Sequence, residues 1–316
     1  MVEQSMFHIY LGDNVSDDSP IRENVHGIRY FPKLNTTKET FREITQKAVD
    51  FGFRSVLIEL ADGIKYKSHP EIAVDGAWEV EDFKEELHRL RSLGLTPYPK
   101  LNFSTAHDAW LGIYSRMVST KTYYKVTREI IHEVIDIFDT PAFFHLGYDD
   151  ENWQSQVRYD YACYRQFELF WHDYRFFLDT LREKGVRPCI CADPYAVDKE
   201  KFLECTPKDV IVSPNYYQAL YEDASTKIPR ANDFLMKKLE TYTALPALGY
   251  EILPACSAYY NGFNIMQVIK YANNEVDQKA VKAILVETLQ PVIERKKNAY
   301  FLAFFKANQA ANALRK

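Results

Sequence analysis

The chain has 316 residues, of which 47% are hydrophobic and 15% aromatic, and its formal net charge at pH 7 is −5. This composition is typical of a globular protein and excludes a disordered chain and a basic nucleic-acid-binding protein. The sequence has no run of 18 apolar residues, so it predicts no membrane-spanning helix and no membrane partner.

Short runs rich in β-branched and aromatic residues alternate along the chain with segments of helical period, which predicts eight strand–helix pairs. The predicted strands are His26–Phe31, Ser55–Leu60, Thr96–Leu101, Ala142–Gly147, Arg187–Ala192, Val210–Pro214, Glu251–Ser257 and Lys282–Glu287. The predicted helices are Lys38–Phe51, Val80–Leu93, Lys121–Phe138, Tyr161–Lys184, Asp198–Glu204, Ala231–Ala247, Asn264–Val276 and Pro291–Leu314.

This alternation favours an α/β fold, a single (β/α)8 TIM barrel over residues 26–316, with residues 1–25 as a short N-terminal extension. A doubly wound open sheet is the alternative, but that fold usually carries a glycine-rich first turn, which this chain lacks. The five cysteines are odd in number and scattered, which favours a reducing compartment. The N-terminus lacks the basic and apolar regions of a signal peptide, so a cytoplasmic location is expected.

In a barrel of this type the active site lies at the C-terminal ends of the strands. The densest polar cluster there is Asp149-Asp150-Glu151, which follows His145 at the end of the fourth predicted strand. Adjacent carboxylates with unequal burial have unequal pKa values, so one can stay protonated as a general acid while its neighbour is ionised. We therefore expect these three acids to be catalytic; the alternative is a solvated turn that caps the next helix.

A second cluster follows the third predicted strand and contains Asn102, His107, Asp108 and Trp110. A tryptophan near a carboxylate and an imidazole can form one wall of a sugar subsite, because pyranose C–H faces stack on indole. The alternative is that Trp110 anchors a packed loop. The other strand ends add further candidate substrate-binding residues, which are Glu59, Asp62, His145, Tyr148, Asp193, Tyr195, Asn215, Tyr217, Tyr259, Tyr260 and Glu287.

Aromatic residues gather at the same strand ends, which predicts an aromatic rim around the acids. The predicted rim consists of Trp110, Tyr148, Trp153, Tyr195, Tyr216, Tyr217, Tyr259 and Tyr260. Such a rim suits a neutral sugar better than a phosphate or a nucleic acid. Glu251, by contrast, begins its predicted strand and is expected at the opposite end of the barrel.

The stretch His145-Leu146-Gly147-Tyr148-Asp149-Asp150 resembles the His-x-Gly-Gly-Asp-Glu signature of family 20 glycoside hydrolases, the β-N-acetylhexosaminidases. The segments 58–63, 100–104 and 107–112 are similar to an uncharacterised branch related to that family, whose fourth strand reads like His-Leu-Gly-Met-Asp-Glu-Glu. With that branch included, the resemblance covers most of the barrel. The second glycine of the signature is replaced here by Tyr148 and its glutamate by Asp150.

The resemblance implies a retaining glycosidase in which the acetamido oxygen of a β-linked sugar attacks the anomeric carbon, so the enzyme supplies no nucleophile. It implies that Asp149 orients the acetamido group and that Asp150, or Glu151 in a shifted register, protonates the leaving oxygen. Tyr259 or Tyr260 and Glu287 would contact the sugar, and Arg29 is a loose equivalent of the family's sugar-binding arginine. Carbohydrate is the expected partner, and no cofactor or metal is expected.

Two other functions fit the pattern of residues. The first is a metal-dependent sugar isomerase or hydrolase barrel, in which Glu59, His107, His145 and Asp193 supply oxygen and imidazole ligands from several strands. The second is a non-catalytic carbohydrate-binding barrel that keeps the aromatic rim but lacks competent acid geometry.

Overall fold

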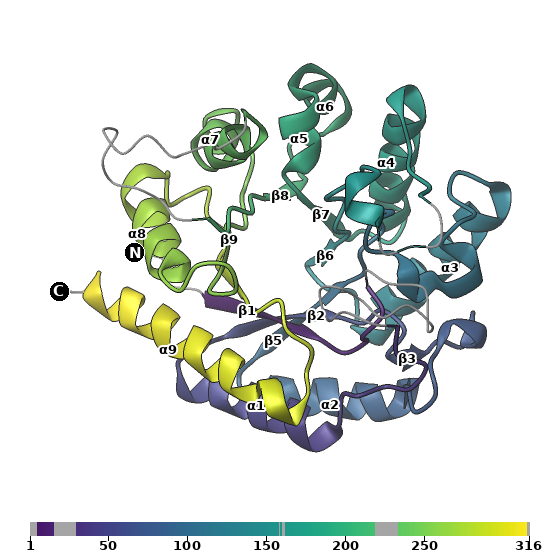
Figure 1. Ribbon diagram of the computed structural model, residues 1–316, viewed down its shortest axis with the longest axis horizontal. Coiled ribbons are helices and arrows are strands. Elements are labelled where there is room, and N and C mark those ends of the chain that lie inside the picture. The colour runs from purple at the N-terminus through teal and green to yellow at the C-terminus, as the bar shows by residue number, and fades with distance from the viewer. Residues whose placement is uncertain (1–4, 16–29, 158, 160–161, 219–232, 315–316) are drawn as a thin grey trace.

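The computed structural model describes residues 5–15, 30–157, 159, 162–218 and 233–314. Strands and helices alternate along most of these residues, and the helices surround a central sheet (Figure 1). The strands are β1 Ser5–Tyr10, β2 Ser55–Glu59, β3 Ile64–Lys65, β4 Trp78–Glu79, β5 Thr96–Lys100, β6 Phe143–His145, β7 Arg187–Cys191, β8 Ile211–Ser213, β9 Ala255–Ser257 and β10 Ile284–Glu287. The α-helices are α1 Lys38–Asp50, α2 Val80–Ser92, α3 Lys121–Ile137, α4 Phe167–Arg182, α5 Asp193–Val197, α6 Lys199–Cys205, α7 Asp233–Ala247, α8 Asn264–Glu275 and α9 Lys297–Ala313. Short 3-10 helices cover Pro70–Ile72, Ala109–Tyr114, Gln154–Gln156 and Glu294–Lys296.

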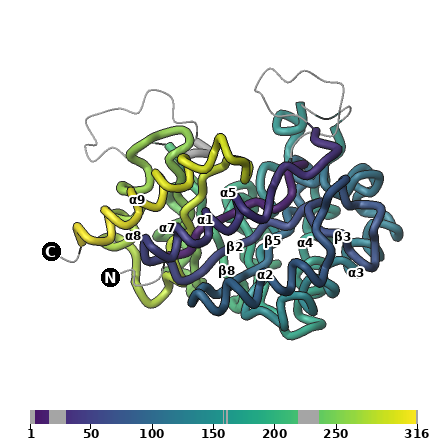
Figure 2. The backbone as a smooth tube through the Cα atoms, turned by 90° about the horizontal axis from the view of Figure 1, so that it is seen from below, coloured from purple at the N-terminus to yellow at the C-terminus, as the bar shows by residue number. Residues whose placement is uncertain are grey.

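The central sheet is parallel and has eight strands in the order β8-β7-β6-β5-β2-β1-β10-β9. Isolated bridges from Val212 to Ile252 and from Asn215 to Ala255 connect the two outer strands, so the sheet closes on itself. The last helix, α9, packs beside α1 and completes the outer ring (Figures 1 and 2). The predicted (β/α)8 barrel is confirmed. The small β3–β4 sheet lies in the connection between β2 and α2.

The first strand of the barrel is β1, not the predicted segment His26–Phe31. Of that segment, the structure describes only Tyr30 and Phe31, and neither is in a strand. β1 pairs in parallel with β10 on one side and β2 on the other, so the range 1–25 contributes a strand to the barrel. The missed signal is the short apolar and aromatic run from Met6 to Tyr10, which His8 interrupts.

Most other predicted elements agree with the structure to within a few residues, and the differences have local causes. Helix α4 begins at Phe167, and Arg165, two residues before it, is held in the loop by Glu151. Strand β9 is limited to Ala255–Ser257, and Pro254 just before it lacks the N–H that a ladder requires. An additional short helix, α5, follows β7 directly.

Side chains of the strands alternate between the barrel interior and the layer that packs against the helices. The larger hydrophobic cluster fills the layer between strands and helices, with members such as Phe7, Ile58 and Phe144. A separate cluster fills the lower interior of the barrel and includes Met6, Leu57, Phe143, Cys189 and Ile211. No helix within the described residues is both long and apolar enough to cross a membrane.

Candidate active site

Asp149 and Asp150 lie in a tight turn that follows β6, at the C-terminal end of the barrel. Gly147, Tyr148 and Asp150 have φ values of +71°, +73° and +53°, so the turn is built from left-handed backbone. Gly147 packs directly on the Asn102 side chain, and an added Cβ would collide with the Asn102 amide group. The glycine of the signature is therefore required both by its backbone conformation and by the close approach of Asn102.

Asn102, at the end of β5, fixes the position of Asp149. Its Nδ2 donates to Asp149 Oδ1 at 2.9 Å, and its Oδ1 accepts from the N–H groups of Ser104 at 3.0 Å and Tyr148 at 3.3 Å. The Ser104 hydroxyl also donates to the Asp149 carbonyl. These bonds tie the acidic turn to the neighbouring loop and predefine the direction of the Asp149 carboxylate.

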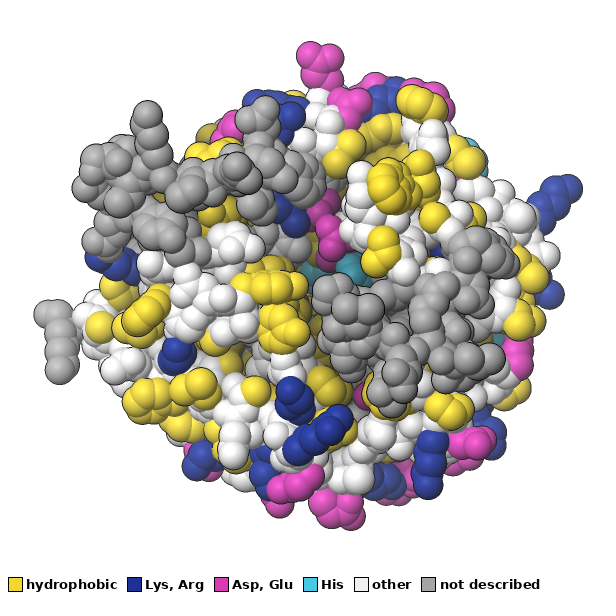
Figure 3. Space-filling view, in the orientation of Figure 1, with side chains coloured by type: hydrophobic (Ala, Val, Ile, Leu, Met, Phe, Trp, Pro, Cys, Tyr) yellow, Lys and Arg dark blue, Asp and Glu magenta, His cyan; other side chains and the backbone are white. Residues whose placement is uncertain are grey.

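His107, in the loop after β5, reaches both acids. Its Nε2 lies 3.8 Å from Asp149 Oδ2 and 3.6 Å from Asp150 Oδ2. Burial alone would lower the pKa of His107, but the charges of Asp149 and Asp150 raise it to about 9. The same contact lowers the pKa of Asp150 against the opposing effect of burial. In Figure 3, histidine and acidic side chains meet in a hollow at the centre of the face.

Asp193, at the start of α5, forms an ion pair with Lys238 on α7, at 3.0 Å between Oδ1 and Nζ. Burial raises the pKa of Asp193 to about 6, because Lys238 offsets it only in part and Asp149 and Asp150 add repulsion. The negative charges of Asp193, Asp150 and Asp149 raise the pKa of Lys238. Lys238 therefore brings positive charge to the acidic cluster from α7, whereas His107 does so from the loop after β5.

Glu151 does not face the hollow with its two neighbours. Its carboxylate accepts from Arg165 Nη1 at 2.9 Å, from the Arg165 backbone N–H at 3.1 Å and from the Thr105 N–H at 2.9 Å. Its side chain is 6% exposed. Its oxygens therefore anchor the loop before α4, and its catalytic role stays a prediction.

Four aromatic residues of the expected rim are buried in the protein. Trp110 is 1% exposed and donates its indole N–H to the Asn102 carbonyl at 3.0 Å, so it anchors a packed loop and does not form an open wall. Tyr148 turns away from the acids, and its hydroxyl donates to the Phe170 carbonyl of α4 at 3.3 Å. Tyr195 and Tyr216 are also buried, whereas Trp153, Tyr259 and Tyr260 are exposed.

Below the acids, the upper interior of the barrel holds a buried polar network. Glu59 at the end of β2 contacts Lys100 Nζ and His8 Nε2, each at 2.9 Å. His8 Nδ1 lies 3.5 Å from Glu287 Oε1, and Glu287 accepts a hydrogen bond from the Tyr217 hydroxyl. Burial opposes ionisation of Glu59, but Lys100 and His8 lower its pKa below the ordinary value.

Four further candidates are buried in separate contacts. Asp62 accepts a hydrogen bond from Asn14, and burial raises its pKa to about 7. Asp108 pairs with Arg116, yet burial still raises its pKa to about 8. His145 Nδ1 accepts from the Gly147 N–H at 3.0 Å. Asn215 lies in the backbone bridge that closes the barrel. Arg29 lies outside the described residues.

Several residues of the site were not predicted. His8 was missed with the first strand, and Lys100 lies on a strand that was predicted but was given no role. Lys238 and Arg165 carry no local sequence signal, because a single cation on a helix or in a loop is usually solvated. Both are recognisable only from the acids that they approach.

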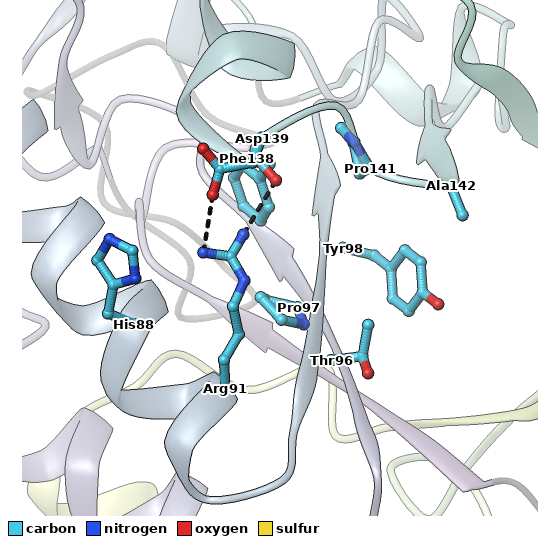
Figure 4. A pocket seen from close by; sticks show the side chains of 9 residues that line it. All are labelled: His88, Arg91, Thr96, Pro97, Tyr98, Phe138, Asp139, Pro141 and Ala142. Atoms are coloured by element: carbon cyan, nitrogen blue, oxygen red, sulfur yellow. Dashed lines mark hydrogen bonds and ion pairs between the residues drawn. The ribbon is translucent and has the colours of Figure 1, made fainter.

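The strand beginnings carry a cleft that is separate from the acids. This cleft, about 380 Å³ in volume, lies where β5 and β6 start, and Arg91 bonds to Asp139 across it at 3.0 Å (Figure 4). Glu251 also lies at this end, where it pairs with Arg187 at the start of β7. Its expected position at the end of the barrel opposite the acids is confirmed.

No family model and no curated protein matches the sequence. Solved structures do match. The β-N-acetylhexosaminidase from Bacteroides fragilis is 14% identical, with a TM-score of 0.59 over 96% of this chain and 65% of that one. A GH20 exo-β-N-acetylglucosaminidase from Vibrio harveyi is 11% identical, with a TM-score of 0.64 over 99% of this chain and 57% of that one. Dispersin B is 12% identical, with a TM-score of 0.58 over 98% of this chain and 100% of that one. This chain therefore has the barrel fold of the family 20 β-N-acetylhexosaminidases.

Proposed function

We propose that the protein is a glycoside hydrolase that cleaves a β-linked N-acetylated sugar with retention of configuration. The observation that carries this proposal is the Asp149–Asp150 pair at the end of β6. The two carboxylates are adjacent in sequence but differ in exposure, with side chains 18% and 44% exposed, and both contact His107. The fold shared with the family 20 enzymes adds support.

Asp149 is suited to orient the substrate. Asn102 holds one of its oxygens, and the other faces His107. A carboxylate fixed in this way can accept the N–H of an acetamido group and direct the acetamido oxygen at the anomeric carbon. The new bond from this oxygen to the carbon forms as the glycosidic bond breaks, so the enzyme needs no nucleophile of its own.

Asp150 is suited to move the proton, because it is the more exposed of the two acids. In its protonated form it would donate to the leaving oxygen, and its carboxylate would then accept a proton from the water that opens the intermediate. The charge of His107 favours the ionised form in the free protein, so the proton must be taken up as substrate binds. A bound sugar that separates Asp150 from His107 would raise the pKa of Asp150 and so favour this uptake.

Tyr217 is a better candidate than Tyr259 or Tyr260 for the tyrosine that works with Asp149. Its hydroxyl bonds to Glu287 in the barrel interior. Burial raises the pKa of Tyr217, and the charges of Glu287 and Asp149 raise it further. The rings of Tyr259 and Tyr260 are instead about half or more exposed.

The direct test is hydrolysis of 4-nitrophenyl N-acetyl-β-glucosaminide by Asp150→Asn and Glu151→Gln. We expect Asp150→Asn to lower kcat by at least ~100-fold, the usual size of general-acid catalysis. Glu151→Gln is the matched control. It should lower the unfolding midpoint, because Glu151 anchors a loop, and should leave kcat within ~10-fold of the parent value. If Asp150→Asn does not reduce turnover by ~100-fold, the assignment of the acid is wrong. NMR of the first product formed must show the β-anomer.

A metal-dependent hydrolase remains a second candidate because of one observation. Single ligand atoms of His107, Asp149 and Asp150 lie within 4.8 Å of one another, close enough for one divalent cation. This set differs from the predicted one, which shares only His107 with it. The other predicted ligands, Glu59, His145 and Asp193, bond to Lys100, Gly147 and Lys238. Loss of activity on chelation and its return with added Mg²⁺, Mn²⁺ or Zn²⁺ would favour this function over the substrate-assisted one.

A further inference from the structure

The loop after β9 presents aromatic rings that the chemistry of the acids does not use. This aromatic loop covers residues 258–263 and contains Tyr259, Tyr260 and Phe263, whose exposed fractions are 50%, 65% and 71%. Such exposure is costly for rings of this size, since each leaves a large apolar surface in water. Tyr259 and Tyr260 stand edge to face with ring centres 4.9 Å apart, and several exposed rings on one short loop favour a binding surface.

The aromatic loop is held rigidly at its base. Asn264, the first residue of α8, is buried and accepts from the Ser257 N–H at 3.0 Å. The Ser257 hydroxyl accepts from the Tyr259 N–H at 3.1 Å, and Asn261 Oδ1 accepts from the Phe263 N–H at 2.9 Å. Lys306 of α9 donates to the Gly262 carbonyl and lies 5.9 Å from the Phe263 ring centre. The rings are therefore presented on a fixed backbone.

The same anchor connects the aromatic loop to the acidic site. Asn264 Nδ2 donates to the carbonyls of Tyr216 at 2.9 Å and Gln218 at 2.7 Å. Tyr217, between these two residues, bonds to Glu287 in the polar network beneath the acids. The loop also follows a strand end, as the acids do, so it lies on the same face of the barrel. Figure 3 shows hydrophobic side chains beside the central hollow on this face.

We propose that Tyr260 and Phe263 form a second carbohydrate subsite, which binds sugar units beyond the one at the acids. This proposal rests on the proposed function and narrows it to an oligosaccharide or polysaccharide substrate. The composition of the loop favours sugar, because flat rings on a rigid backbone match the C–H faces of pyranose units. A lipid surface would instead favour aliphatic side chains accompanied by a cluster of cations.

The test is isothermal titration in the Asp150→Asn background, which prevents turnover. The probes are a β-1,4-linked tetrasaccharide of N-acetylglucosamine and the N-acetylglucosamine monosaccharide. We expect the combined Tyr260→Ala and Phe263→Ala change to raise the Kd for the tetrasaccharide at least ~10-fold and to leave the monosaccharide unchanged, since each ring contact is worth about three- to tenfold. Tyr260→Phe with Phe263→Trp should restore the affinity, because both retain a flat ring.

Phe305→Ala is the matched control, because this ring on α9 is 50% exposed but packs toward Phe51 at the end of α1. Unchanged tetrasaccharide affinity in the loop variant would overturn the inference, as would ring-dependent binding to phosphatidylcholine vesicles. Hydrolysis by the unmodified protein separates the two proposals. Turnover without loop-dependent binding refutes the subsite alone, and loop-dependent binding without turnover refutes the hydrolase alone.

Discussion

The lower and upper halves of the barrel interior are built from the same strands but have opposite chemistry. The lower half is apolar, with Leu57 and Phe143 among its members. Glu59 is the next inward-facing residue of β2 after Leu57, and it pairs with Lys100 and His8. Buried charge is costly unless it is paired, so the upper half must be arranged by its partners, whereas the lower half needs only the right volume. The half that carries this cost is the one beneath the acids.

The largest expected effect is from breaking the pair in the upper half. Glu59→Gln keeps the volume of the side chain but leaves Lys100 buried without its counter-charge, which should lower the free energy of unfolding by about 3–5 kcal/mol. Urea denaturation at pH 7 measures this effect. The double variant with Lys100→Met should recover much of the loss. A single variant as stable as the parent would show that the pair is not needed for folding.

A smaller loss is expected from Leu57→Ala in the lower half. This change removes buried methyl groups and leaves a cavity, which typically costs about 3 kcal/mol. No charge is involved, so the loss should be the same at pH 6 and pH 9. A pH-dependent loss at Leu57 would mean that the two halves are coupled.

His107→Gln tests the acids above the interior, and its effect should depend on pH. The pKa of His107 in the folded protein is about 9, above its unfolded value, so its stabilisation is complete below about pH 6.5 and is lost as pH rises through 9. His107→Gln should therefore cost about 2 kcal/mol at pH 6, allowing for partial exposure, and little at pH 10. Urea denaturation across this range is the measurement. The opposite trend would show that His107 is neutral in the folded protein.

The smallest effect is expected at the strand beginnings. Arg187 and Glu251 are 2.6 Å apart, but about a third of each side chain is exposed. Exposed pairs contribute about 0–1 kcal/mol, so Arg187→Gln should change stability by less than that and leave kcat unchanged. A larger loss would mean that the lower end of the barrel also depends on paired charge.

Much of the fold could be predicted because it depends on patterns that repeat locally. The alternation of buried strands and amphipathic helices located seven of the barrel strands to within a few residues, except that β9 proved much shorter than predicted. The first strand was missed because Met6–Tyr10 is one short run with a histidine in it, and only its pairing with β2 and β10 identifies it. At the site, the sequence also indicated that Asp149, Asp150 and His107 belong to one end of the barrel.

Residue type and spacing by themselves determined the barrel, the end that carries the acids, and the motif in which they stand. Tertiary structure alone decided which of these side chains a substrate can reach, because residues far away in sequence bond to some of them and cover others. Glu151 is withdrawn by Arg165, and Trp110 is buried against Asn102, whereas Asp150 stays half exposed. Three consecutive acids are chemically similar in a sequence. They acquire different roles only when folding gives each one a different neighbour.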